Sequence, residues 1–106
     1  MAIIYSVDTT KPVTPEIARD ALVQCFSEAH CMDAGLGEAP SDQNKNYCKE
    51  IIRQAFADTE GDFDQPTKQS LVRAITQLVT FSRAFRKPEI IEKHKVAIMT
   101  LVELLP

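Results

Sequence analysis

The sequence predicts an all-α protein, an antiparallel four-helix bundle preceded by a short extended N-terminal arm. Four segments carry apolar residues at three- and four-residue steps, which is the spacing of one face of an α-helix. Short connections rich in glycine, proline and acidic residues separate these segments, and such connections place consecutive helices side by side and antiparallel. We therefore expect residues 1–13 to form the arm and residues 14–106 to form one helical domain.

The size and composition suit a single globular domain. The chain has 106 residues, 44% hydrophobic and 25% charged, a balance typical of folded proteins and enough for one core. No window of about 18 uninterrupted apolar residues occurs, so we expect no membrane span. The first residues lack a basic leader, so we expect no signal peptide. Three cysteines without paired spacing argue against a disulfide scaffold and favour a cytoplasmic setting.

The N-terminal arm contains one strand-like stretch. Residues 2–7, AIIYSV, have the β-branched content of a strand. Strand signals are scarce in the rest of the chain, and a single strand needs a partner for its backbone groups. We favour an arm laid over the bundle, and the alternative is a strand that pairs with another copy of the chain.

The first two helices have recognisable ends. Thr14 and Pro15 should begin the first helix, because threonine caps helices and proline suits the first helical position. Gly35 is placed to end it in a left-handed turn, and Ser41 or Asp42 should cap the second helix. The two apolar faces are formed by Ile17, Ala18, Ala21, Leu22, Cys25, Phe26, Ala29 and Met32, and by Tyr47, Cys48, Ile51, Ile52, Ala55 and Phe56.

The third helix, Thr67–Arg86, is apolar over roughly half of its circumference. A helix of that kind needs neighbours on more than one side, so we expect it to be the central helix of the bundle. Lys87-Pro88 should end it, because proline cannot donate a backbone hydrogen bond and disfavours helical geometry in the preceding residue. A fourth helix is expected from Pro88 to about Leu105.

The net charge of −3 conceals an uneven distribution. From Lys68 to Lys95 there are seven basic and two acidic residues, which gives +5 and leaves −8 for the remainder. The basic residues at the junction of the third and fourth helices are Arg83, Arg86, Lys87, Lys93 and Lys95. Cations stabilise a helix C-terminus, which explains this basic corner structurally, but free amides at the next helix start would also suit an anion. The negative net charge and the absence of a groove-reading motif argue against duplex nucleic acid.

Three cysteines and one histidine are the residues most suited to catalysis or metal binding. Cys25 and Cys48 lie on apolar faces and should be buried thiols, whereas Cys31 points away from its apolar face and should be exposed. His94 interrupts the apolar stripe of the fourth helix. We expect His94 to be buried and hydrogen-bonded, with Ser82 as a conceivable partner.

The sequence predicts neither a metal site nor a cofactor. His30, Cys31, Met32 and Asp33 lack the paired spacing of zinc ligands. The acidic turn at residues 58–66 lacks the order of a calcium-binding loop. No phosphate-binding loop, dinucleotide fingerprint, G-x-S-x-G or H-E-x-x-H motif occurs.

We interpret the chain as a non-enzymatic helical interaction module, a small regulatory or adaptor protein with a protein partner. Val23, Val96 and Met99 should lie on outward helix faces, where apolar residues can mark an interface. A homodimer is favoured, because a two-fold contact would cover these residues and pair the N-terminal strand. The alternative is an enzyme or a cofactor- or metal-binding bundle that uses His94 or the free thiols.

Overall fold

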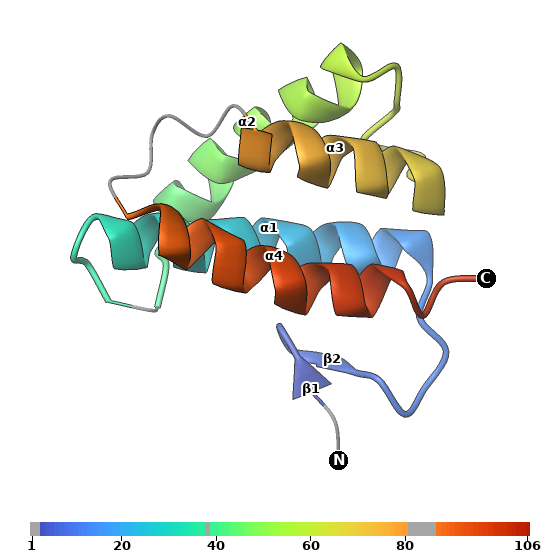
Figure 1. Ribbon diagram of the computed structural model, residues 1–106, viewed down its shortest axis with the longest axis horizontal. Coiled ribbons are helices and arrows are strands. Elements are labelled where there is room, and N and C mark those ends of the chain that lie inside the picture. Colours follow the sequence, from blue (N-terminus) through green and yellow to red (C-terminus); the bar gives the residue numbers. More distant parts are fainter. Residues whose placement is uncertain (1–2, 38, 81–86) are drawn as a thin grey trace.

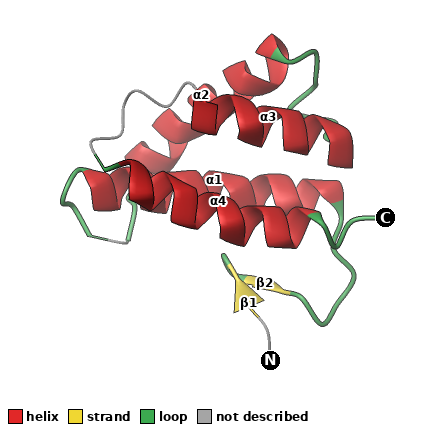
Figure 2. Ribbon diagram, in the orientation of Figure 1, coloured by secondary structure: helices red, strands yellow, loops and turns green. Residues whose placement is uncertain are grey.

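The structure is a computed structural model that describes residues 3–37, 39–80 and 87–106. A two-stranded hairpin and four helices follow one another along the chain: β1 (Ile3–Ile4), β2 (Val7–Asp8), α1 (Pro15–Asp33), α2 (Asp42–Asp58), α3 (Lys68–Thr80) and α4 (Pro88–Val102). Consecutive helices run antiparallel, and α1 and α4 lie side by side with the hairpin beneath them (Figure 1, Figure 2). The predicted all-α four-helix bundle is confirmed.

The predicted helix ends of α1 are confirmed. Thr14 is the N-cap, and its hydroxyl accepts a hydrogen bond from the Ile17 N–H at 3.2 Å. Gly35 follows the C-cap with a φ of +75°, and its N–H donates to the Met32 carbonyl at 3.1 Å. Glycine adopts this left-handed conformation without steric cost, which explains why α1 ends there.

The next two helices also start at side-chain caps. Ser41, not Asp42, caps α2 and accepts a hydrogen bond from the Asn44 N–H at 3.2 Å. Thr67 and Ser70 cap α3 reciprocally: each hydroxyl accepts from the other residue's backbone N–H, at 3.1 and 2.8 Å. The predicted extension of this helix to Arg86 lies outside the described residues.

The N-terminal arm folds back on itself, so the prediction that its strand lacks a partner in the chain is wrong. Ile4 pairs with Val7, and Ile3 with Asp8, in an antiparallel register. Tyr5 and Ser6 form the turn with φ values of 48° and 68°, and positive φ at both positions is the requirement of a type I′ hairpin turn. Asn-Gly is the usual signal for this turn, and Tyr-Ser does not resemble it.

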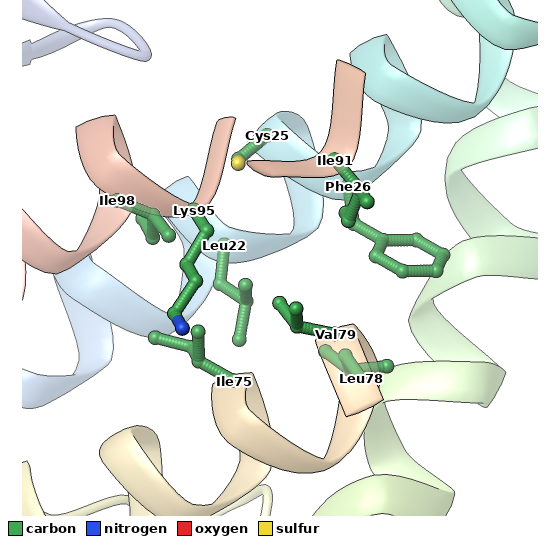
Figure 3. Close-up of a pocket in the computed structure, with 9 residues that line it drawn as sticks. All are labelled: Leu22, Cys25, Phe26, Ile75, Leu78, Val79, Ile91, Lys95 and Ile98. Atoms are coloured by element: carbon green, nitrogen blue, oxygen red, sulfur yellow. The ribbon is translucent and has the colours of Figure 1, made fainter. Parts of the chain in front are cut away.

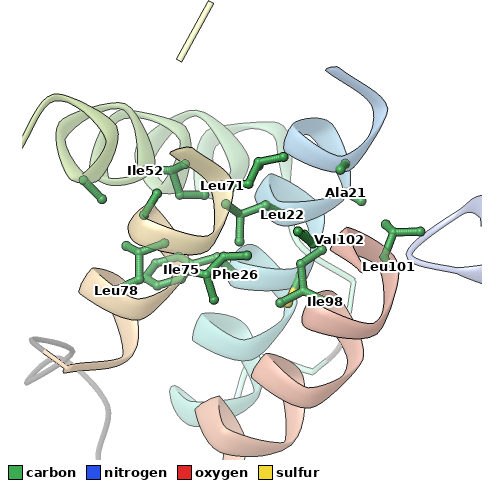
Figure 4. Close-up of a cluster of buried hydrophobic side chains, with 14 of the residues drawn as sticks. Ala21, Leu22, Phe26, Ile52, Leu71, Ile75, Leu78, Ile98, Leu101 and Val102 are labelled. Carbon is green, nitrogen blue, oxygen red and sulfur yellow. The ribbon is translucent and has the colours of Figure 1, made fainter. Parts of the chain in front are cut away.

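α3 contacts each of the other three helices, as its broad apolar face predicts, but α1 has the more extensive contacts, so α1 and not α3 is the central helix of the bundle. α1 packs extensively against α4 and α2 and also touches α3. One side of α1 carries the expected apolar row, whereas the side toward α2 buries Ser27 and Cys31, which a hydrophobic stripe does not reveal. The core between the helices includes Ala21, Leu22, Phe26, Ile52, Leu71, Ile75, Leu78, Ile98, Leu101 and Val102 (Figure 4).

Phe63 fixes the acidic turn between α2 and α3 to the bundle. Its buried ring meets the edge of Phe56, with ring centres 5.8 Å apart. The guanidinium groups of Arg19 and Arg53 lie 5.1 and 4.5 Å from the Phe63 ring centre, in cation–π contact. Arg53 also pairs with Asp64 at 3.4 Å, so this acidic turn is held by arginines.

None of the described helices combines the length and the apolar character that a membrane crossing requires.

Candidate functional site

The predicted basic corner is only partly described. Arg83 and Arg86 lie outside the described residues, and Lys87 is exposed at the start of α4. Lys93 lines a groove beside the hairpin, whereas Lys95 lines a crevice that faces α3. Lys93 and Lys95 therefore leave α4 on different sides, as expected for residues two apart on a helix. Anion binding at this corner stays a prediction.

The start of α4 is capped by a side chain from α1. Lys87, the N-cap residue, donates its backbone N–H to Oδ1 of buried Asp33 at 2.7 Å. No side chain of the N-cap residue itself contributes to the cap. The Asp33 carboxylate thus satisfies one backbone donor at the point where the sequence suggested an anion site.

His94 is half-buried and belongs to the contact between α4 and the hairpin. Its Nδ1–H donates to the Ile90 carbonyl at 2.8 Å, since a carbonyl oxygen can only accept. The ring stacks on Tyr5 with centres 6.1 Å apart and an interplanar angle of 24°. Ser82, the partner suggested by the sequence, lies outside the described residues.

Tyr5 joins the hairpin to both long helices. Its hydroxyl hydrogen-bonds the side chain of Cys25 on α1, and the Cys25 thiol donates to the His94 carbonyl on α4, with a sulfur–oxygen distance of 3.6 Å. Burial raises the pKa of Cys25 to about 12, and burial, Cys25 and Glu28 together raise the pKa of Tyr5. Both groups are therefore protonated at neutral pH, and Cys25 is a poor nucleophile.

The prediction that Cys31 is exposed is wrong. Its side chain is 1% exposed because α2 packs on that side of α1, and Asn44 donates from Nδ2 to its sulfur at 3.4 Å. Cys48 is buried as predicted, and burial raises the pKa of its thiol. Tyr47, predicted to face the core, is 58% exposed and lies against the His30 ring, with centres 5.8 Å apart.

Two open grooves flank Tyr5. One, of about 280 Å³, lies between the hairpin turn and α1 and is lined by Ile17, Asp20 and Gln24. The other, of about 240 Å³, lies between α1 and α4, and we call it the Tyr5 groove. The residues that line the Tyr5 groove are Tyr5, Glu28, Met32, Lys93, His94 and Ala97.

The Tyr5 groove carries opposite charges but no reactive nucleophile. Glu28 from α1 and Lys93 from α4 contribute a carboxylate and an ammonium group. The nearby thiol of Cys25 is held as a protonated donor. This arrangement suits the binding of a charged molecule better than covalent catalysis, which requires an activated nucleophile.

Side chains from α1, α3 and α4, most of them buried, meet at a small crevice (Figure 3). Its volume of about 10 Å³ leaves room for roughly one water molecule, so the crevice is a packed contact and not a ligand cavity. Val79 of α3 and Lys95 of α4 both line this crevice. Val72 lies seven residues before Val79 on α3, and Met99 lies four residues after Lys95 on α4. Each therefore lies on the same side of its helix as that crevice residue.

We define the α3–α4 seam as the two crevice residues Val79 and Lys95 together with three residues that helical spacing assigns to it, Val72, Val96 and Met99. Val96, three residues before Met99, is 68% exposed, whereas Met99 is half-buried and packs against the core. Val23, the third predicted interface residue, lies apart on α1. It shares a helix side with Ser27, which contacts Cys48 of α2.

Sequence reasoning missed the roles of Asp33, Tyr5 and Glu28, although it considered Asp33 as a metal ligand and Tyr5 as part of the N-terminal strand. Asp33 had a usable signal, because an acidic residue in the last turn of a helix opposes the helix dipole and therefore suggests another partner. The role of Tyr5 depends on the pairing of the two hairpin strands within the chain, which the sequence did not predict. Glu28 occupies an ordinary polar position on α1.

No group of three metal-ligating side chains occurs within residues 3–37, 39–80 and 87–106. Comparisons of the chain with protein-family models, with curated proteins and with solved structures find no match.

Proposed function

We propose that this chain is a non-enzymatic interaction module, a small regulatory or adaptor protein that binds a protein partner along the α3–α4 seam. The observation that carries this proposal is the 68% exposure of Val96, one helical step from the half-buried Met99 on α4. Two adjacent helices with an apolar seam form the kind of groove in which a partner helix packs its own apolar face.

A partner helix would cover the half-buried apolar residues of the seam. Val72, Val79 and Met99 are half-buried, so a partner would complete their burial without exposing the core. Lys95 lies along the apolar crevice and contributes its aliphatic stem, as lysines do when their charged end reaches water. Isolated apolar residues on a surface are ordinary, but a row on two packed helices favours contact with another protein.

The alternative function, an enzyme or cofactor binder that uses His94 or the thiols, has less support. Burial raises the pKa of Cys25 and Cys48, and a thiol that stays protonated is a weak nucleophile and a weak metal ligand. His94 combines a fixed Nδ1 hydrogen bond with a stack on Tyr5, which is the environment of a structural histidine.

We further propose a second copy of the chain as the partner, in a two-fold homodimer within the cytoplasm. In a two-fold dimer each chain contributes the same patch to the interface, so one seam of this kind is enough to form a dimer. A standard interface buries about 800 Å² on each partner, roughly one eighth of the 6327 Å² surface of this chain. The pairing of β1 with β2 removes the unpaired strand as a reason for a dimer, so the seam alone supports it.

Native mass spectrometry of the protein purified from its own host tests the class of function. We expect a retained protein, either a second copy or a different chain, and we expect Val96→Glu to release it. Leu36→Glu is the matched control, because Leu36 has nearly the same exposure and lies beyond the end of α1. A retained metal or cofactor without a protein partner would contradict the proposal and favour the alternative.

A further inference from the structure

We propose that the Tyr5 groove binds a small zwitterion, a molecule that carries an ammonium and a carboxylate at the two ends of a short apolar chain. The Tyr5 groove lies beside the hairpin, and none of the residues that line it belongs to the α3–α4 seam. The inference therefore goes beyond the proposed protein interaction and does not depend on it.

The shape of the groove limits the size of the ligand. Its volume of about 240 Å³ is below the roughly 300–1,000 Å³ of sites for drug-sized molecules. Met32, Ala97 and the Tyr5 ring provide apolar surface along it. A short aliphatic chain fits this combination of size and lining.

Two opposite charges stand on different helices of the groove. Glu28 belongs to α1 and Lys93 to α4, and among the described residues neither is part of an ion pair. Packed helix axes lie about 8–10 Å apart, so charged ends from two helices suit a ligand whose own charges are separated by several bonds. The ligand ammonium would pair with Glu28 and its carboxylate with Lys93.

Two further residues of the lining, His94 and Tyr5, are held in place before any ligand arrives. His94 is fixed by its Nδ1 hydrogen bond to the Ile90 carbonyl. Tyr5 is fixed by its stack on His94 and by its contact with Cys25. A preorganised lining loses little conformational entropy on binding, which favours affinity for even a small ligand.

Three matched compounds test the charge requirement: 6-aminohexanoate, hexanoate and hexylamine. Each is titrated into the full chain while the methyl signals of Met32 and Ala97 are followed by nuclear magnetic resonance. We expect saturable shifts with 6-aminohexanoate and about tenfold or weaker binding of the two compounds that lack one charge, since each charged hydrogen bond is lost. Absence of saturation, or equal binding of all three compounds, would overturn the proposal.

Charge-removing variants locate the site. Glu28→Gln and Lys93→Gln should each weaken 6-aminohexanoate binding about tenfold or more, by the same loss of one charged partner. Glu92→Gln and Lys11→Gln are the controls, because neither residue lines the groove, and they should bind as the wild type does. Circular dichroism checks that all four variants keep their helix content. Wild-type affinity in both groove variants would place the ligand elsewhere and reject the assignment.

Discussion

Asp33, at the end of α1, accepts a hydrogen bond from the backbone N–H of Lys87, at the start of α4, over 2.7 Å. The contact connects two helix ends that are 54 positions apart in the sequence. It gives α4 the cap that its own N-cap residue does not provide.

We therefore expect Asp33→Ala to lower the free energy of unfolding by about 1–2 kcal/mol, the upper part of the range for lost helix caps. Urea denaturation measures this change. Asp58→Ala is the control, because Asp58 is exposed and its substitution should stay within about 0.5 kcal/mol. Equal effects of the two variants would show that Asp33 has no capping role.

The hairpin is held on the bundle by Tyr5, since this residue meets Cys25 on α1 and His94 on α4. Tyr5→Ala should lower the unfolding free energy by about 1–3 kcal/mol and speed hydrogen exchange of the Ile4 and Val7 amides. Tyr5→Phe keeps the ring and the stack, so its effect should be about 0.5–1.5 kcal/mol, the value of one hydrogen bond. If the exchange rates are the same in Tyr5→Ala and the wild type, another contact holds the hairpin.

Most of the fold was predictable because helix ends and apolar faces are local features. Thr14, Pro15, Gly35 and Pro88 each act through their own backbone preferences, and all four mark the expected boundaries. The central position of α1 was not predictable in this way. It depends on Ser27 and Cys31, small polar and sulfur-containing side chains that become buried only because α2 packs over them.

Alkaline pH should destabilise the protein through Cys25. The folded state holds the thiol proton up to a pKa of about 12, whereas the unfolded chain releases it near 9.0. The unfolded state therefore binds fewer protons between pH 9 and 12, and stability falls there as pH rises, with a slope of at most about 1.4 kcal/mol per pH unit from this group. Below pH 9 the contribution of the Cys25 thiol to the stability of the folded state is fully present.

Urea denaturation at pH 8, 9, 10 and 11 tests this dependence. Cys25→Ala should be less stable at pH 8, because it leaves a small cavity, but its stability should decline less steeply. Tyr5 adds a decline in the same direction, since its pKa is also raised, so the comparison uses the difference in slope between wild type and variant. Identical slopes would contradict a buried, proton-retaining Cys25.

Phe63 should be among the most sensitive residues outside the helices. Phe63→Ala removes a buried ring together with its contacts to Phe56, Arg19 and Arg53, and should lower the unfolding free energy by about 3–5 kcal/mol. Phe63→Leu keeps apolar volume but loses the ring, so its effect should be smaller, about 1–2 kcal/mol. Thermal and urea melts of both variants give the comparison, and an unchanged melt for Phe63→Ala would refute the anchoring role.

The candidate sites were less predictable than the fold, because each depends on elements far apart in the sequence. The sequence placed Lys93, Lys95, Val96 and Met99 on one helix but did not separate its hairpin side from its α3 side. To separate these two sides of α4, the positions of both the hairpin and α3 must be known. The Tyr5 groove in turn requires a hairpin whose turn residues resemble no common turn motif.

Light scattering coupled to size exclusion tests the α3–α4 seam most directly. At about 50 μM the wild-type protein should elute with the mass of two chains, since an interface of ordinary affinity is largely occupied at that concentration. Val96→Glu and Met99→Lys should elute as single chains with unchanged helix content, because each puts an unpaired charge into the contact. Leu36→Glu should remain a dimer. A wild-type mass of one chain would contradict the dimer, and a dimer that survives both seam substitutions would place its interface elsewhere.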